Sequence, residues 1–346
     1  MSAKSFAPSN ALRFREDLPR GHVESYFVRA NHPTKKLAIW LKATVFAPRG
    51  HHGTKGAVAE LWCIVFHGEG GRVWANKRTV PFAEASFTGD GPEVRLAGAQ
   101  LDLGAKGRAV GSMEGDGGPC RWDLRWEAEP STPMGRPMLL LPSERLLDDR
   151  VPTFKIVTPR PILRASGTIT VAGETLDVDG WWGMDGHNWA RAHAWDYVWG
   201  QCVFVDEHDT PVCVAEGFTG RTRVAGLVTP PLSALVVRRG AKEYRFDGIV
   251  DLWRQDAVID DLRWTVRLRS KDGEALLRME ADAREMACLG YPNPDGRISY
   301  CFNSKLARTH LRVNPVNEEG FEVSSAHGGA LEFLHNAPDP RFPKIV

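Results

Sequence analysis

The amino-acid sequence predicts an all-β protein made of short antiparallel strands. It contains 12 tryptophans and 34 glycines in 346 residues, and flat aromatic side chains joined by tight turns suit strands better than helices. Apolar and polar residues alternate strictly in several segments, which is the period of a half-buried strand. A long segment with the 3.6-residue period of an amphipathic helix is missing. Only residues 11–15 and 142–147 could form a helical turn or two.

The strongest alternation occurs in residues 122–129, where two tryptophans, a leucine and an alanine share one face and charged residues occupy the other. The same period predicts a hairpin over 264–279, with Asp-Gly at its turn. A second hairpin is expected over 168–178, where Gly173 can supply the positive φ of a tight turn. Further strands are expected at 37–46, 59–67, 198–205, 212–216 and 234–239, some of them apolar on both faces.

A proline-rich stretch divides the chain near its middle. Between Pro130 and Pro161 the strand pattern is interrupted repeatedly by proline, which removes a backbone donor from a sheet. We therefore expect one domain over residues 1–150 and a second over 151–346. Each has the length of an eight- to ten-stranded barrel or sandwich, and no direct sequence repeat relates the two.

Composition excludes several classes of partner. Lys and Arg total 44 against 43 for Asp and Glu, so the net charge is +1 and no global field favours nucleic acid or an anionic membrane. The N-terminus lacks the apolar stretch of a secretory signal, and no segment is long enough to span a membrane. The six cysteines are scattered, as expected of reduced thiols in a cytoplasmic protein.

The segment Gly180–Cys202 is the densest in residues suited to binding. It holds five tryptophans and two histidines in 23 residues. Aromatic walls bury apolar ligand surface and face a carbocation with their π clouds, while His and Asn supply fixed polar contacts. Taken singly, each of these residues is better explained by core packing or turn formation, but the cluster as a whole favours a pocket. The candidate substrate-binding residues here are Trp182, Asp185, Asn188, His193, Trp195 and Trp199.

Glu216 is the candidate acid. In the strand expected at 212–216 it shares a face with Val212 and Val214. If that face points into a barrel, desolvation raises the pKa of Glu216 and keeps it protonated near neutrality, as protonation of a carbon–carbon double bond requires. An exposed strand end beside Gly217 is an equal alternative.

Other chemistries find little support in the sequence. His187 and His193 lie six residues apart and His51 adjoins His52, but neither spacing matches a zinc signature, so no metal is expected. There is no G-x-S-x-G elbow. The glycine-rich runs at 68–71 and 115–118 lack the following lysine or helix of a phosphate site and are expected to be hairpin turns. No cofactor is expected.

Two groups of motifs resemble those of a known family. They are Asp185–Trp189 with His193, Trp195 and Trp199, and the opening segment Glu24–Asn31 followed by Ala38–Leu41. These motifs are similar to those of the lipocalin-like proteins grouped with carotenoid 1,2-hydratase (hydroxyneurosporene synthase) and tocopherol cyclase.

The resemblance implies two consecutive lipocalin-like (calycin) antiparallel β-barrels with a cavity for an isoprenoid or other lipid-like molecule. Enzymes of that family add water or an internal hydroxyl to an alkene without a redox cofactor. By the resemblance, His187 and Trp189 form the catalytic His-x-Trp pair, Glu216 is the matching carboxylate, and Tyr26 and Asn31 belong to the substrate site. The chain departs from the family in having Val214 in place of a tyrosine and glutamate in place of aspartate.

The leading hypothesis is a cofactor-independent enzyme that protonates a lipophilic alkene, as hydratases, cyclases and isomerases do. Glu216 would be the acid, His187 would orient it or accept a proton, and Trp189 would stabilise positive charge. The alternative is a non-catalytic carrier of a lipid or terpenoid, for which the aromatic wall suffices. A third hypothesis is a β-sandwich whose exposed tryptophans stack on sugar rings.

Overall fold

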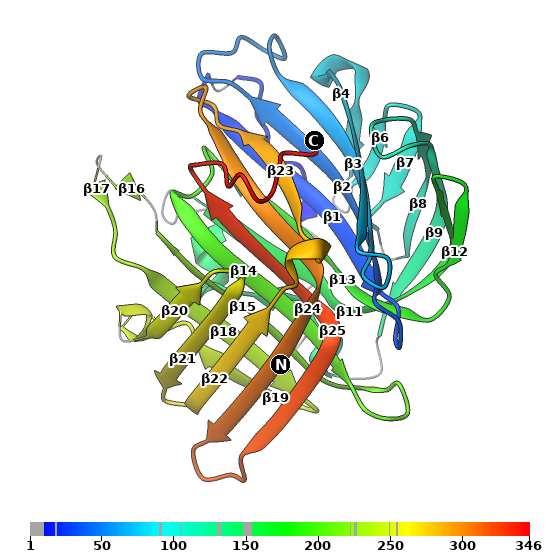
Figure 1. Cartoon of the computed structure of the whole chain (residues 1–346). Helices are drawn as coiled ribbons and strands as arrows, with labels where there is room; N and C mark the ends of the chain where they lie inside the picture. The colour runs from blue at the N-terminus through cyan, green and yellow to red at the C-terminus, as the bar shows by residue number, and fades with distance from the viewer. Residues whose placement is uncertain are drawn as a thin grey trace.

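Two antiparallel β-sheets account for nearly all the regular structure (Figure 1). The computed structural model describes residues 10–17, 19–89, 92–104, 106–129, 133–147, 154–221, 223–224, 227–248, 250–253 and 255–346. The all-β prediction is confirmed.

The first sheet has 13 strands in the order β4-β3-β2-β1-β13-β11-β9-β8-β7-β6-β5, with β10 and β12 paired to β11. Its strands are β1 (His22–Asn31), β2 (Leu37–Ala47), β3 (Val58–His67), β4 (Arg72–Pro81), β5 (Ser86–Thr88), β6 (Glu93–Leu96), β7 (Ala99–Asp102), β8 (Gly107–Met113), β9 (Cys120–Ala128), β10 (Met138–Leu139), β11 (Phe154–Val171), β12 (Glu174–Asp177) and β13 (Trp181–Ala190). Short 3₁₀ turns lie at η2 (Phe82–Glu84), η3 (Pro133–Gly135) and η4 (Glu144–Leu147).

The second sheet has ten strands in the order β19-β18-β15-β14-β25-β24-β22-β21-β20, with β23 paired to β24. Its strands are β14 (Asp196–Val205), β15 (Pro211–Arg221), β18 (Leu232–Arg239), β19 (Lys242–Phe246), β20 (Asp256–Asp260), β21 (Arg263–Ser270), β22 (Gly273–Glu280), β23 (Ala287–Pro292), β24 (Ile298–Pro315) and β25 (Phe321–His335). The strands β16 (Arg223–Val224) and β17 (Leu227–Val228) form a separate ribbon, and 3₁₀ turns lie at η5 (Asp251–Trp253) and η6 (Ala283–Glu285).

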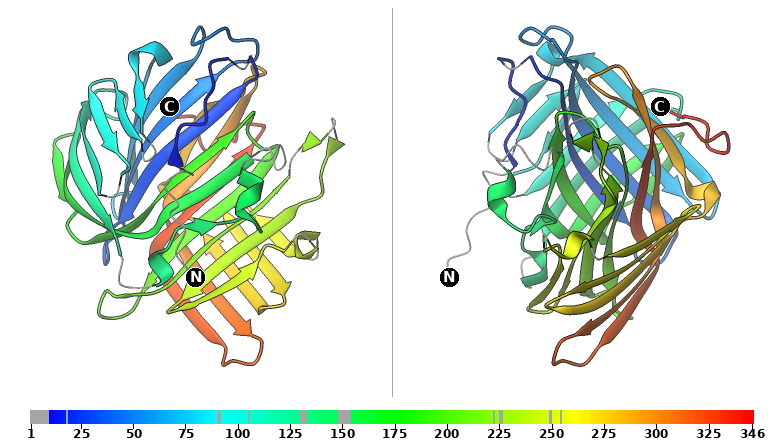
Figure 2. Two further views of the ribbon diagram at one scale, coloured as in Figure 1. Left: turned by 180° about the vertical axis from the view of Figure 1, so that it is seen from behind. Right: turned by 90° about the vertical axis from the view of Figure 1, so that its left-hand side faces the viewer.

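Each sheet curls around its own apolar core, and the two sheets also pack against one another (Figures 1 and 2). Because side chains alternate across a strand, β1 sends Tyr26 and Val28 into the first core and Phe27 into the layer between the sheets. On β14, Val198 enters the second core and Trp199 enters the same intermediate layer. This layer explains why these strands are apolar on both faces.

The change from one sheet to the other comes between Ala190 and Asp196. The boundary expected between residues 150 and 151 does not coincide with it, since β11, which follows the proline-rich stretch, pairs with β9 and β13 of the first sheet. Two prolines, Pro159 and Pro161, lie inside β11 where its register with β13 shifts. Bulges let a strand accommodate proline without leaving the sheet.

All the strands expected from alternation form, and the hairpin turns lie where the sequence predicts them. Ala172 and Gly173, at the β11–β12 turn, both have positive φ (50° and 85°), as a two-residue hairpin loop requires. The glycine-rich runs at 68–71 and 115–118 are the β3–β4 and β8–β9 turns. Of the two expected helical turns, 142–147 becomes η4. Residues 11–15 form no helix, because the amides of Arg13 and Phe14 donate to the Glu24 carboxylate instead.

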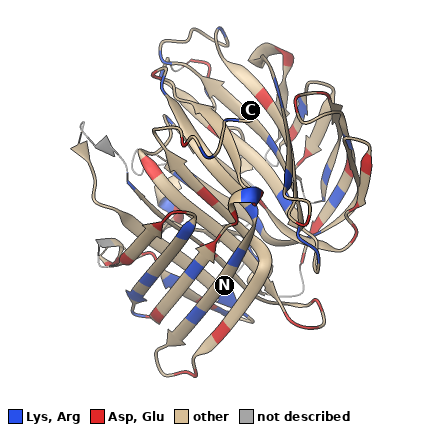
Figure 3. Cartoon of the chain, viewed as in Figure 1, with Lys and Arg blue, Asp and Glu red and all other residues tan. Residues whose placement is uncertain are grey.

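Charged residues of both signs are interspersed over the two sheets in the view of Figure 3. All six cysteines are unpaired and buried. Within the described ranges, no helix has both the length and the apolar composition needed to cross a bilayer.

Candidate functional site

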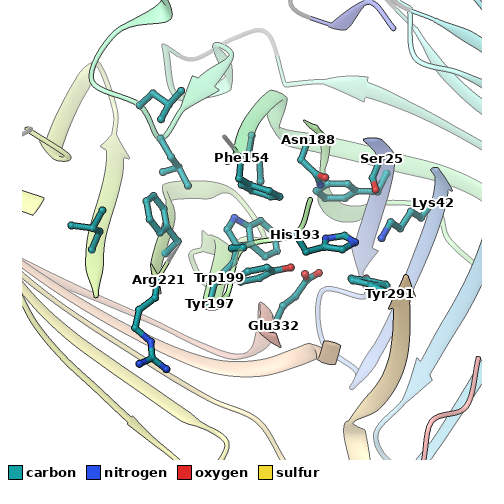
Figure 4. A pocket seen from close by; sticks show the side chains of 18 of the residues that line it. Ser25, Lys42, Phe154, Asn188, His193, Tyr197, Trp199, Arg221, Tyr291 and Glu332 are labelled. Atoms are coloured by element: carbon teal, nitrogen blue, oxygen red, sulfur yellow. The ribbon is translucent and has the colours of Figure 1, made fainter. Parts of the chain in front are cut away.

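An apolar pocket lies between the two sheets and has a volume of about 170 Å³ (Figure 4). Its wall is mostly aromatic and aliphatic. It is contributed by β1, β2, β11, β13, β14, β15, β18, β23 and β25, together with the segment after β10 and the connection between β13 and β14. The apolar lining residues are Phe27, Trp40, Leu140, Leu141, Phe154, Ile156, Ala194, Tyr197, Trp199, Phe218, Leu232 and Tyr291. This composition fits a ligand that is largely hydrocarbon.

The pocket was expected inside a barrel, and the structure places it in the layer between the sheets. The interior of the first sheet is filled by large side chains such as Trp122, Trp126 and Trp181. A void between Leu41 and Trp122 in that interior has a volume of only about 10 Å³, no more than a single water needs.

One end of the pocket carries a group of polar side chains from both sheets. Figure 4 shows the Tyr197 hydroxyl and the Glu332 carboxylate on the side toward His193. The His193 ring stacks on Tyr291, with 5.3 Å between ring centres. Burial, with a smaller effect of the nearby Lys42 amine, lowers the pKa of His193 to about 3. Burial also raises the pKa of both tyrosines well above the usual value, so the imidazole is neutral and both phenols are protonated.

Lys42 brings an amine to the same end of the pocket. It lies on β2, is 6% exposed, and its Nζ is 4.1 Å from the centre of the Tyr291 ring. Burial lowers the pKa of Lys42 to about 8, an effect that the Glu332 carboxylate limits. The Glu332 carboxylate itself accepts a 2.6 Å hydrogen bond from Lys305 Nζ.

Glu216, the expected acid, is buried directly behind the pocket wall. It is 1% exposed, and its carboxylate accepts hydrogen bonds from Trp199 Nε1 (3.0 Å) and Thr158 Oγ1 (2.7 Å). Burial raises the pKa of Glu216 to about 7, against the lowering effect of these two hydrogen bonds. The alternative of an exposed strand end is excluded, but Trp199 and not Glu216 lines the pocket.

This burial predicts a pH-dependent stability difference between the wild type and Glu216→Gln. As the pH rises from about 4.5 to 7, the unfolded chain ionises Glu216 before the folded chain does, so this group lowers the free energy of unfolding by about 3 kcal/mol over that window. Glutamine does not titrate and keeps partners for Trp199 and Thr158. Urea denaturation at pH 4.5 and 7.5 should therefore show the variant gaining about 3 kcal/mol relative to wild type.

The control for this experiment is Glu207→Gln, which changes a carboxylate that is 86% exposed. The pH dependence of the stability difference should be clearly larger for Glu216→Gln than for this control. Equal pH dependence of the two variants would show that burial does not delay the ionisation of Glu216 in the folded protein.

His187 does not join Glu216 in one cavity. It lies on the face of β13 that turns into the first sheet, stacked on Tyr26 with 4.1 Å between ring centres. Its Nε2 is 2.8 Å from Glu24 Oε1. Burial alone would raise the pKa of Glu24, but the hydrogen bonds from His187 and His22 outweigh burial and hold that pKa well below its usual range. His187 and Tyr26 are thus part of a buried hydrogen-bond cluster around a carboxylate.

Asp185 and Trp189 share that face of β13 with His187. The Asp185 carboxylate accepts hydrogen bonds from Arg160 Nε (2.5 Å) and from Trp126 Nε1 (3.3 Å), and all three groups are buried. Trp189 packs among Leu139, Leu147 and Val157 under the segment that follows β10. Neither residue lines the pocket.

Three more expected binding residues serve other contacts. Asn31 Nδ2 donates to the backbone oxygens of Lys305 and His327 and so joins the two sheets. Trp182 Nε1 donates to Asp209 Oδ1 at 2.8 Å. Trp195 lies under the Arg297 guanidinium, 5.6 Å from it.

Of the expected site residues, Asn188, His193 and Trp199 line the pocket together. Polar or titratable lining residues that the sequence did not single out include Lys42, Tyr197, Tyr291 and Glu332. The sequence offered one indication that Lys42 could belong to a site, because Lys42 is the single charged residue in the apolar run Leu37–Phe46. In the part of the chain that the structure describes, no group of three or more His, Cys, Asp or Glu side chains is arranged to hold a metal ion.

Comparison with known proteins supports the fold. No protein-family model matches the sequence. The uncharacterized proteins Rv0493c and MT0513, from two strains of Mycobacterium tuberculosis, are each 23% identical over 295 residues, which covers 85% of this chain and 82% of theirs.

Solved structures with similar folds include an AttH-like protein, CghA and kievitone hydratase. An AttH-like protein (NE1406) of Nitrosomonas europaea has a TM-score of 0.56 and 14% identity, with 96% of this chain and 98% of that one covered. CghA has a TM-score of 0.58 and 13% identity, with 93% of this chain and 89% of CghA covered. Kievitone hydratase of Nectria haematococca has a TM-score of 0.54 and 10% identity, with 97% of this chain and 93% of the hydratase covered. The chain thus shares an all-β, two-sheet fold with these proteins.

Proposed function

We propose that this protein is an enzyme that transfers a proton to or from a lipophilic, unsaturated small molecule, as hydratases, cyclases and isomerases do. The observation that carries the proposal is the pocket between the sheets, which is apolar along most of its wall and ends on His193, Tyr197, Tyr291 and Glu332. A purely structural cavity has no need for several buried acid–base groups, because each must be desolvated.

The groups at this end suit proton transfer in complementary ways. A neutral His193 imidazole can accept a proton, and the protonated Tyr197 hydroxyl can donate a hydrogen bond to a developing negative charge. The aromatic faces of Trp199 and Phe27 can stabilise positive charge on carbon. Isoprenoid alkenes fit this wall, and the fold is shared with a protein named as a hydratase.

In this proposal Glu216 is a positioning residue. Its carboxylate holds the Trp199 indole through a 3.0 Å hydrogen bond and thereby fixes the pocket wall. His187 and Trp189, which face away from the pocket, contribute to folding.

Deuterium transfer to carbon tests the proposal. The protein is incubated in D₂O with geraniol, farnesol and farnesoic acid, and the recovered compounds are analysed by mass spectrometry. We expect deuterium on carbon, or addition of D₂O, in at least one compound. His193→Gln should reduce this at least ~100-fold, the usual contribution of a general acid or base.

The matched control is His208→Gln, a histidine with a side chain that is 79% exposed on the β14–β15 turn, which should leave the rate unchanged. If the compounds bind but none exchanges, the protein is a carrier, the alternative that the apolar wall also allows.

A further inference from the structure

Lys42 is a buried cation without an anionic partner. Its ammonium lies among aromatic rings, 5.5 Å from the centre of Trp40 and 5.4 Å from that of Trp62, in addition to Tyr291. Among the described residues it has no hydrogen bond and no ion pair, and its side chain lines the pocket (Figure 4). A buried charge is costly unless a counter-charge accompanies it.

The neighbouring charges are already matched. Lys305 Nζ pairs with Glu332 at 2.6 Å, and Lys77 Nζ pairs with Glu60 at 3.6 Å. Three ammonium groups therefore face two carboxylates, which leaves one positive charge in excess. The other titratable groups close to Lys42 do not offset it, because His193 is neutral and burial raises the pKa of the Cys301 thiol to about 12.

An unused donor lies in the same wall. The indole nitrogen of Trp40 is buried and has no hydrogen-bond partner among the described residues, although the Trp40 ring lines the pocket. An unsatisfied buried donor costs free energy. The indole nitrogen is closed off from the pocket, so the Lys42 ammonium, whose side chain lines the pocket, is the group that an acceptor entering with the ligand can reach.

We infer that the substrate is an unsaturated carboxylic acid whose carboxylate binds Lys42 and whose hydrocarbon chain occupies the apolar part of the pocket. This inference rests on the proposed function and sharpens it from lipophilic molecules in general to lipophilic acids. With the carboxylate at Lys42, the adjoining carbons lie at the end of the pocket where His193 and Tyr197 are found.

Ligand binding tests the inference without turnover. Quenching of tryptophan fluorescence gives the Kd of farnesoic acid and of farnesol, which share the same chain but differ in charge. We expect the wild type to bind the acid at least ~10-fold more tightly, since a hydrogen bond to a charged group contributes about 1.5–3 kcal/mol. Lys42→Met should remove this preference and leave the Kd of farnesol within about twofold.

Two further variants make the result specific. Lys42→Arg keeps the charge and should keep the preference for the acid. Lys77→Met removes an ammonium 4.6 Å from the same Trp62 ring, but one that is paired with Glu60, and should change neither Kd.

Equal Kd values of the acid and the alcohol for the wild type would overturn the inference. An equal weakening of the binding of both ligands in Lys42→Met would also overturn it. Either result would leave the proposed proton transfer standing, because the deuterium experiment includes the alcohols. Conversely, a preference for the acid without deuterium transfer would support a carrier of lipophilic acids.

Discussion

Replacing Glu24 by alanine is expected to destabilise the protein by at least about 4 kcal/mol. The carboxylate is fully buried and accepts hydrogen bonds from the backbone amides of Arg13 and Phe14, and from the side chains of His22, Tyr26 and His187. Removing the acceptor leaves several buried donors unsatisfied, each at a cost of about 1–3 kcal/mol before relaxation. It also releases the segment before β1 from the sheet.

Guanidinium denaturation at several pH values measures this effect. The pKa of Glu24 is lowered on folding, so its contribution is fully present above the unfolded value of about 4.5 and is lost as the pH falls below it. The difference between wild type and Glu24→Ala should therefore be largest near neutrality and shrink in acid. Tyr26→Phe, which removes one donor, is the control and should cost about 1 kcal/mol.

A third variant of this cluster, His187→Gln, separates a structural role of the cluster from a catalytic one. If the cluster only supports the fold, His187→Gln lowers the free energy of unfolding and leaves deuterium transfer per folded molecule unchanged. Loss of transfer in a stably folded His187→Gln protein would restore His187 to the catalytic role expected from the sequence.

Replacing Asp185 by alanine is expected to cost about 3–5 kcal/mol of stability. The carboxylate pairs with the buried Arg160 guanidinium at 2.5 Å and accepts a 2.9 Å hydrogen bond from the Arg160 amide. Alanine removes the Asp185 carboxylate from beside this buried guanidinium, which costs more than the ion pair itself contributes. Urea denaturation at pH 7 measures the loss.

The double variant Asp185→Leu with Arg160→Met provides the control, because it removes both charges and fills the space with apolar atoms. It should recover most of the stability that Asp185→Ala loses. An Asp185→Ala protein that is as stable as wild type but no longer binds farnesol would instead place Asp185 in the ligand site.

Local patterns in the sequence determined the class of fold and most of the strands. Residues 122–129 alternate between apolar and charged, and β9 buries alternate residues accordingly. The period of two is a property of the extended backbone itself, and turn residues such as Gly173 act through their own φ. These features need no knowledge of distant residues.

Sequence separation limited what could be predicted about the site. The three pocket residues found, Asn188, His193 and Trp199, lie in one short segment that is rich in aromatic residues. Tyr291 and Glu332 come from β23 and β25, and nothing in their neighbouring residues marks them as facing a cavity.

Tertiary structure alone decided which face of each strand meets the ligand. On β13, Asn188 turns toward the layer between the sheets, while His187 turns into the first sheet. Both faces of this strand are buried, so hydrophobic alternation cannot distinguish them. The expectation that His187 and Glu216 act together in one cavity depended on which face of β13 meets the ligand. The packing of one curled sheet on the other determines which face meets the ligand. The same packing brings Lys42 of β2 to the same end of the pocket as Glu332 of β25.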